Sequence, residues 1–304
     1  MLTLFSIPKP FVGHIGTIQR NAIGSWLRLR PRPEVILLGN EDGTAELAAR
    51  LGARHLPEVE RNSHGTPLLS SLFARAIAAA THEMLCYVNA DIILLSDFAA
   101  MTACVGRAHC LVIGKRTDLD LTEEIDFSES NWEKDVRDRA RQAGRLFSRT
   151  GIDYLLFPKG LWRHLPPFAI GRLMWDNWLV YDARRRKLQV VDATRVVTAI
   201  HQNHDYSVQM KAAHGGWNWD LPETRRNLEL AGGHDNSYNI DDCTHVLLPS
   251  GIWPAFGSAY LRQRLKRPPF KPWTPTLRSH LMRAAIKCGL RGQGLVNRIR
   301  RATN

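Results

Sequence analysis

The sequence predicts an α/β protein whose mostly parallel central sheet lies between layers of helices, with a small C-terminal extension. Three observations support this fold class. Short apolar runs alternate with segments whose apolar residues recur at helical spacing. Two of these runs, 34–38 and 85–88, stop abruptly at polar residues, as strands do at the ligand-binding edge of an open sheet. A chain of 304 residues, 44% of them hydrophobic, is also long enough to bury a substantial core.

The expected elements follow one another as strand and helix, which indicates parallel strands with helices on both faces. Residues 118–138 are acidic and polar without a clear period, and are expected to form a mobile insertion or a lid. In the helix at 66–80, Thr66 is the expected cap and Pro67 the expected first residue. Strands are expected at 2–7, 34–38, 85–88, 110–113 and 154–157 and within 188–200, and helices at 17–29, 45–51, 66–80, from about 96, at 173–181 and at 222–230.

The charge distribution divides the chain into a neutral body and a basic tail. Residues 1–260 carry 29 basic and 29 acidic side chains, whereas residues 261–304 carry 12 basic ones and no acidic one. We expect a main domain at 1–215, an extension at 216–260 that contributes to the acceptor side, and a Pro-rich linker with an amphipathic tail at 261–304. A neutral body makes nucleic-acid binding an unlikely function.

The tail has apolar residues on one side of a helical wheel and basic residues on the other. Such a stretch can bind an anionic membrane surface, although a helix packed on the domain or a disordered tail would fit the same pattern. The chain has no apolar run of the length of a membrane span, about 18 residues or more, and its N-terminus lacks the pattern of a signal peptide. Its five cysteines form no CxxC pair. We therefore expect a cytoplasmic protein, with the inner face of the membrane as a candidate contact of the tail.

The segment Asn89-Ala90-Asp91 directly follows the strand at 85–88. Because side chains alternate along a strand, Asn89 and Asp91 are expected to point to the same side. Both offer hard oxygen atoms that suit Mg²⁺ or Mn²⁺, and an ion held there would neutralise a diphosphate. The alternative is an ordinary polar strand end.

Two histidines follow the last strand-like run. His201 comes immediately after Ile200, and His204 lies three residues further on. Imidazole is a common ligand of transition ions, so either ring could complete a metal site begun by Asp91, with the other supporting it. A structural role for both rings is the alternative.

Polar residues also follow the second strand. Asn40, Glu41 and Asp42 could accept hydrogen bonds from a ribose or from a base N–H, and Pro8 would lie beside them at the end of the first strand. Asn, Asp and Gly dominate surface turns, which is the alternative interpretation.

Two further carboxylates are candidates for catalysis. Asp176 lies between Trp175 and Trp178, where partial burial would raise the pKa of its carboxyl towards that of a general base. A helix start, with Asp176 facing the helix dipole, is the alternative. Asp153 precedes the strand at 154–157 and could contact sugar hydroxyls.

The order of these motifs resembles that of GT-A type nucleotide-diphospho-sugar transferases, and specifically of bacterial and plant proteins similar to glycosyltransferase family 2. The resemblance rests on five segments, at residues 4–11, 37–43, 87–91, 175–178 and 200–206. It implies an α/β/α sandwich, a nucleoside-diphosphate sugar as donor, and often Mn²⁺ or Mg²⁺. Such enzymes usually carry an Asp-x-Asp metal motif. Asp91 matches its metal-binding position, whereas Asn89 brings no charge to the first position.

By the same resemblance, His201 or His204 matches a late histidine that completes the metal site, and Asp176 looks like the base of inverting members. The predicted function is transfer of a sugar from a nucleoside-diphosphate sugar to a hydroxyl acceptor, with metal assistance. Two alternatives stay open: a sugar nucleotidyltransferase, and a non-catalytic sugar-binding or scaffold protein with a degenerate metal site. The sequence leaves the donor sugar, the acceptor and the stereochemistry undetermined.

Overall fold

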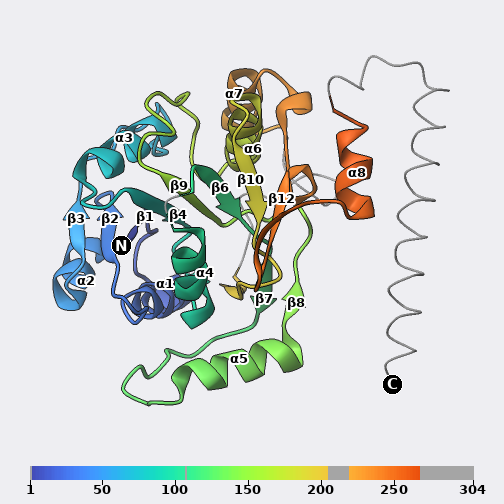
Figure 1. The fold of residues 1–304 in the computed structure, drawn as a ribbon. Helices are drawn as coiled ribbons and strands as arrows, with labels where there is room; N and C mark the ends of the chain where they lie inside the picture. Colours follow the sequence, from blue (N-terminus) through green and yellow to red (C-terminus); the bar gives the residue numbers. More distant parts are fainter. Residues whose placement is uncertain (1, 107, 205–218, 268–304) are drawn as a thin grey trace, which may run out of the picture.

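The computed structural model describes residues 2–106, 108–204 and 219–267, and it confirms the predicted α/β class (Figure 1). Within these residues the strands form a larger and a smaller sheet. The larger sheet contains β1 (Leu2–Ser6), β2 (Glu34–Leu38), β3 (Arg54–Leu56), β4 (Met84–Val88), β6 (Cys110–Ile113), β9 (Tyr154–Pro158), β10 (Gln189–Asp192), β12 (His245–Leu248) and β13 (Gly251–Pro254). The smaller sheet contains β5 (Ile92–Ile93), β7 (Arg116–Leu119), β8 (Arg145–Leu146) and β11 (Ala199–Gln202).

The larger sheet has the order β13-β12-β10-β6-β9-β4-β1-β2-β3 and is mostly parallel, as expected. Strands β3, β2, β1 and β4 are parallel neighbours, and so are β6, β10 and β12. β9 lies between these two groups and is antiparallel to both β4 and β6. The polar segments that follow β1, β2 and β4 therefore meet at one edge of the sheet.

Helices cover both faces of this sheet. They are α1 (Gly13–Trp26), α2 (Thr44–Leu51), α3 (Leu69–Ala79), α4 (Ser96–Val105), α6 (Trp175–Arg185), α7 (Pro222–Ala231) and α8 (Ser258–Arg264), with two 3-10 turns, η1 (His234–Asn236) and η2 (Ile240–Asp242). Helix α5 (Trp132–Ala143) packs against the smaller sheet. One core joins α3, α6 and α7 to the sheet, and the other joins α1, α2 and α4 to its opposite face. β4 supplies both cores because its side chains alternate: Leu85 and Tyr87 enter the first, Cys86 and Val88 the second.

The smaller sheet has the order β5-β11-β7-β8 and lies beside α5 (Figure 1). The range 118–138, expected to form a mobile insertion or a lid, contains the end of β7 and the first half of α5, with an irregular segment at 120–131 between them. The apolar face of α5 consists of little more than Val136 and Ala140, one helical turn apart, which pack against Ile93, Leu119 and Ile200. Such a narrow stripe among many charges gives little periodic signal.

The start of α3 also differs from the expectation. Pro67 is not the first helical residue, because Arg61 and Pro67 form an isolated antiparallel bridge, as do Leu68 and Ala169. The helix begins at Leu69. This extended entry places residues 64–67 at the rim of the cavity described below.

The C-terminal part of the described chain continues the larger sheet. β12 pairs in parallel with β10, and β13 pairs with β12. Arg267 anchors the end of this region, because its guanidinium contacts both carboxylate oxygens of Asp242 and stacks 3.8 Å from the Tyr238 ring. The predicted boundary near 215 and the amphipathic tail lie outside the described residues. Among those that are described, every helix is too short or too polar to cross a bilayer.

Candidate active site

A cavity of about 560 Å³ opens at the C-terminal ends of β1 and β4. Its walls come from the loop after β1, the turn after β4, residues 64–67 and the start of α6. Of the predicted site residues, Pro8, Glu41, Asn89, Asp91, Asp153, Asp176 and His204 line it. His201 lies behind Asp91 with 1% of its surface exposed, and Asn40 and Asp42 are exposed on the loop after β2. The structure thus gathers most of the predicted residues in one place.

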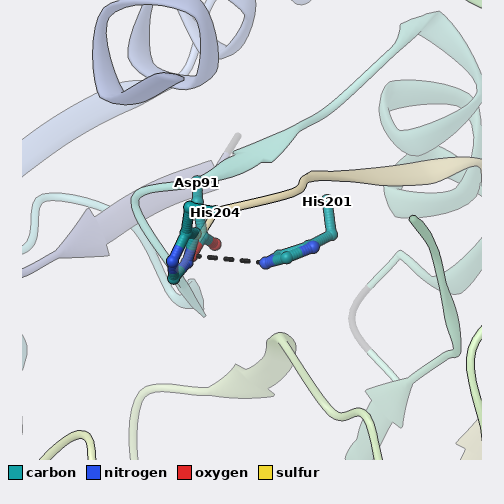
Figure 2. A group of neighbouring side chains, drawn as sticks. All are labelled: Asp91, His201 and His204. Atoms are coloured by element: carbon teal, nitrogen blue, oxygen red, sulfur yellow. Dashed lines mark hydrogen bonds and ion pairs between the residues drawn. The ribbon is translucent and has the colours of Figure 1, made fainter. Parts of the chain in front are cut away.

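Asp91, His201 and His204 form a cluster whose candidate ligand atoms all lie within 4.8 Å of one another (Figure 2). Nε2 of His204 lies 3.1 Å from Oδ2 of Asp91, and Nε2 of His201 lies 3.6 Å from the same oxygen. The other carboxylate oxygen of Asp91 is buried and has no hydrogen-bond partner among the described residues. A carboxylate oxygen and two imidazole nitrogens fit a divalent transition ion such as Mn²⁺.

The charges of this cluster are strongly coupled. Burial alone would raise the pKa of Asp91, but the two imidazoles hold it well below its usual value. Burial would lower the pKa of His201, but the charge of Asp91 and contacts with Asp118 and Asp91 raise it to about 9. At neutral pH Asp91 is therefore anionic, as a cation ligand has to be, whereas His201 is protonated, so a cation that binds its imidazole has to displace that proton.

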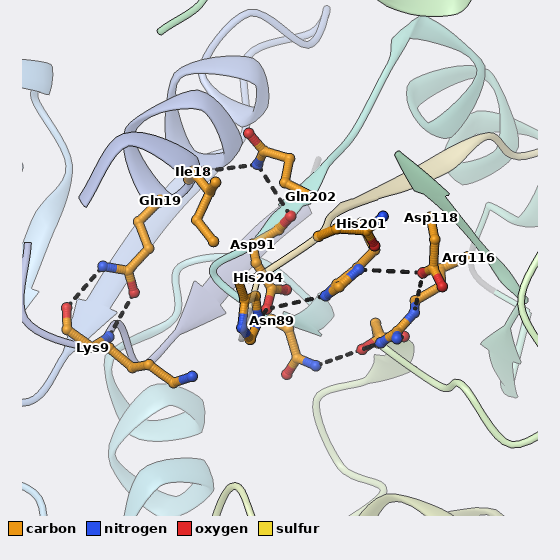
Figure 3. Close-up of polar contacts among 12 residues, drawn as sticks. Lys9, Ile18, Gln19, Asn89, Asp91, Arg116, Asp118, His201, Gln202 and His204 are labelled. Atoms are coloured by element: carbon orange, nitrogen blue, oxygen red, sulfur yellow. Dashed lines mark hydrogen bonds and ion pairs between the residues drawn. The ribbon is translucent and has the colours of Figure 1, made fainter. Parts of the chain in front are cut away.

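The smaller sheet brings the cluster together. Asp91 directly precedes β5, and β11 pairs with β5 so that His201 lies opposite Ile92. The side chain of Gln202 is fully buried and donates to the backbone oxygens of Ile18 and Asp91. The turn that carries Asp91 is therefore fixed to both α1 and β11 (Figure 3).

Asn89 and Asp91 lie in the turn between β4 and β5 and not on a strand, so the alternation argument does not describe them. Nδ2 of Asn89 donates to Oδ1 of Asp153 (2.7 Å), and its Oδ1 accepts from the Tyr87 hydroxyl (2.9 Å). Because an ionised carboxylate only accepts, Asp153 fixes the orientation of the amide. The carbonyl oxygen of Asn89 is thus engaged by Tyr87, away from the cluster of Asp91 and the histidines.

Asn89→Asp would restore the common Asp-x-Asp pattern, yet we expect it to reduce Mn²⁺ affinity and stability. It would place a second carboxylate in the position that now donates to buried Asp153, where like charges repel. Loss of that donor is expected to cost about 1–3 kcal/mol. Titration with Mn²⁺ and denaturant unfolding would test this, with Asn131→Asp in the exposed N-cap of α5 as the matched control. Tighter Mn²⁺ binding by the Asn89 variant would contradict the assignment.

Asp176 occupies the first turn of α6 and faces the same cavity. Burial, together with the charge of Asp153, raises the pKa of Asp176 to about 7, although backbone N–H groups at the helix start act in the opposite direction. Met174, the residue that caps α6, has a φ of 91°, a conformation that a side chain rarely adopts. Backbone strain of this kind often occurs at functional sites. A carboxyl that titrates near neutral pH is suited to accept a proton.

Asn177 connects the start of α6 to the C-terminal region. Its side chain donates to the backbone oxygen of Tyr238, and the Tyr238 N–H donates to the backbone oxygen of Asn177. Ser237, the neighbour of Tyr238, lines the cavity. The segment at 237–238 therefore forms the wall of the cavity next to Asp176.

The loop after β1 forms the opposite end of the cavity. Gln19 accepts from the backbone N–H of Lys9 and donates to its backbone oxygen, which fixes the loop between Pro8 and Pro10. Glu41 contacts Arg61 through Oε1 at 2.6 Å, while its buried Oε2 has no hydrogen-bond partner among the described residues. A Cβ at Gly39, where φ is 93°, would lie 2.5 Å from that Oε2. Glycine at 39 therefore permits the position of the Glu41 carboxylate.

Comparison with solved structures finds distant matches to this chain. Glucosyl-3-phosphoglycerate synthase from Mycobacterium tuberculosis, in complex with Mg²⁺ and UDP, is 14% identical over 77% of this chain and 80% of its own, with a TM-score of 0.46. TarS 1–349 from S. aureus, in complex with UDP-GlcNAc, is 10% identical over 76% of this chain and 65% of its own, with a TM-score of 0.46. No protein-family model and no curated protein matches the chain. At this level of similarity, function has to be argued from the site itself.

Two residues that contact the predicted site were missed by sequence reasoning. Arg116 lines the cavity, with its guanidinium 3.0 Å from Asp153 and 2.8 Å from Asp118. Asp118 lies in turn 3.2 Å from Nδ1 of His201. Residues 116–118 are three consecutive polar residues and give no strand signal, and Asp118 falls within the range interpreted as an insertion or a lid.

Proposed function

We propose that this chain is a glycosyltransferase that moves a sugar from a nucleoside-diphosphate sugar to a hydroxyl acceptor with the help of a divalent ion. One observation carries the proposal. A single cavity is lined by Asp91 and His204, with His201 directly behind Asp91 to complete a cluster that suits a cation, and by a separate carboxyl whose pKa is about 7. A metal-bound diphosphate as leaving group and a proton-accepting base are the two requirements of direct sugar transfer to a hydroxyl.

Asp91, His201 and His204 would hold the ion. When bound, a divalent cation supplies positive charge where negative charge develops on the leaving diphosphate. Two imidazole ligands favour Mn²⁺ over Mg²⁺, because Mg²⁺ prefers oxygen ligands and keeps its waters. Asn89 brings no charge to the site, and its amide is held in place by Asp153, which it contacts at 2.7 Å.

The donor nucleotide is assigned to the end of the cavity near Pro8 and Glu41. The unpartnered Oε2 of Glu41 would accept a hydrogen bond from the base or the ribose, with Asn40 and Asp42 on the same loop. The narrow loop at Pro8–Pro10, fixed by Gln19, would provide the opposite wall.

Asp176 would act as general base. The acceptor hydroxyl oxygen forms a bond to the anomeric carbon as the bond from that carbon to the diphosphate oxygen breaks, and the hydroxyl proton passes to the Asp176 carboxylate. Asp153, predicted as a possible sugar contact, already accepts from Asn89 and Arg116. We therefore assign it the role of holding Asn89 and of raising the pKa of Asp176.

A screen of nucleotide sugars tests the proposal. UDP-sugars and GDP-sugars would be added to the full chain with and without Mn²⁺, followed by thermal unfolding and product analysis. Ligand at 100 times its Kd should stabilise the fold by about 2.7 kcal/mol, with a larger effect in the presence of Mn²⁺. Release of free nucleoside diphosphate is the expected result. Release of pyrophosphate would indicate nucleotidyl transfer instead, and the absence of any binding would refute the assignment.

A further inference from the structure

His201 is held from two sides by carboxylates. Its Nε2 faces Asp91 at 3.6 Å, and its Nδ1 lies 3.2 Å from Oδ1 of Asp118 (Figure 3). The second contact follows from the register of the smaller sheet, because β7 and β11 are parallel and His201 lies directly opposite Asp118. With 1% of the residue exposed, the ring has little room to turn.

Asp118 is itself fixed. Nε of Arg116, two residues earlier on the same strand, donates to Oδ1 of Asp118 at 2.8 Å. The same guanidinium donates to both oxygens of Asp153 and stacks 4.2 Å from the ring of Phe147. Arg116 is 7% exposed, so these contacts are shielded from water. The carboxylate of Asp118 is thus held in one place beside the imidazole.

We propose that Asp118, held by Arg116, is the positioning residue that orients His201 towards the cation. A proton on Nδ1, which lies 3.2 Å from Oδ1 of Asp118, leaves the Nε2 lone pair for the position beside Asp91. This inference rests on the proposed metal site. A histidine that binds a metal through one nitrogen usually donates from the other to a carboxylate, and loss of that partner commonly lowers metal affinity 10–100-fold.

A purely structural role for Asp118 makes a different prediction. If the carboxylate only neutralised Arg116 within the smaller sheet, its removal would lower stability and leave the metal ligands unchanged. Metal affinity and the coordination of His201 therefore have to be measured separately from unfolding.

The test compares Mn²⁺ binding to the full-length wild-type chain and to Asp118→Asn. Binding is followed by the electron paramagnetic resonance of free Mn²⁺, and coordinated imidazole by its ¹⁴N modulation in pulsed spectra. We expect an affinity about 10–100-fold weaker in the variant and a reduced ¹⁴N signal. Asp120→Asn is the matched control. It removes the same charge two residues further on, from a side chain that contacts Asn203 and not His201.

The outcomes separate the two levels of the proposal. Wild-type protein that binds no Mn²⁺ would overturn the metal site and with it the role of Asp118. Wild-type binding with unchanged affinity and ¹⁴N signal in Asp118→Asn would overturn only that role, as would an equal loss in Asp120→Asn. If Asp118→Asn fails to fold, Asp118→Glu replaces it. That variant keeps the charge opposite Arg116 but displaces the carboxylate, so the same weakening is expected.

Discussion

Asp91→Ala is expected to abolish Mn²⁺ binding and to reduce sugar transfer on the order of 10²–10³-fold or more, the effect of removing charge stabilisation from a leaving group. Asp91 supplies the one anionic ligand of the candidate site, and its buried Oδ1 has no other partner among the described residues. The measurements are Mn²⁺ titration and initial rates at saturating donor. Asp138→Ala on the exposed side of α5 is the control for removal of an acidic residue. Turnover at the wild-type rate in the Asp91 variant would refute the assigned role.

The same substitution has a second consequence, for stability without metal. The pKa of His201 is about 9 in the folded protein, above its ordinary value of 6.5. The favourable pairing with Asp91 is therefore fully present below about pH 6.5 and is lost as the pH rises through about 9. We expect Asp91→Ala to destabilise the metal-free protein by about 1–3 kcal/mol at pH 6 and by much less at pH 9.5. Denaturant unfolding at the two pH values measures the difference.

The candidate metal site was predictable because each part of it carries a local signal. The apolar run at 85–88 stops at polar residues, as strands do in an open α/β sheet, and the histidines follow a second strand-like run. In the structure His201 lies within β11 of the smaller sheet. Nε2 of His204 lies 3.1 Å and Nε2 of His201 lies 3.6 Å from Oδ2 of Asp91. The structure also confirms the mostly parallel sheet. This prediction was possible because the buried strands β1, β2 and β4 are short apolar runs bounded by polar turns.

The rest of the site depends on pairings that local sequence does not encode. β5 and β8 contain two residues each, too few for any periodicity. The neighbour of Asn89 is Asp153, which directly precedes β9. This contact arises because β9 runs antiparallel to β4 within a sheet expected to be mostly parallel. Asp118 reaches His201 only through the register of β7 and β11. Such contacts between distant segments are determined by tertiary packing.

Asp176→Asn is expected to lower the rate of sugar transfer without destabilising the fold. Loss of the base should lower the rate of transfer by about 10²–10⁴-fold, the usual contribution of a general base. In the wild type, the rate should rise with pH and reach half of its maximum near pH 7, because the carboxyl has to be ionised to accept the proton. A pH–rate profile from pH 5 to 9 measures this. A wild-type rate that is independent of pH over this range would contradict the assignment of Asp176 as base.

Although Asp176→Asn should lower the rate of transfer, it should raise the stability of the fold at pH 8. The folded-state pKa of about 7 lies above the ordinary value of 3.8, so ionisation of Asp176 is less favourable in the folded protein than in the unfolded chain. The wild type therefore loses stability as the pH rises from about 4 to about 7, and a neutral asparagine avoids this loss. We expect the variant to match the wild type near pH 4 and to be more stable by about 1–3 kcal/mol at pH 8.

Denaturant unfolding at both pH values tests this, with Glu229→Gln on the exposed face of α7 as the control for loss of a charge. If the variant loses activity and gains stability at pH 8, the ionised carboxylate of Asp176 is needed for transfer but lowers the free energy of unfolding of the wild type. Equal stability of the two proteins at pH 8 would show that the carboxyl ionises as readily in the fold as in water, and that burial does not prepare it for proton transfer.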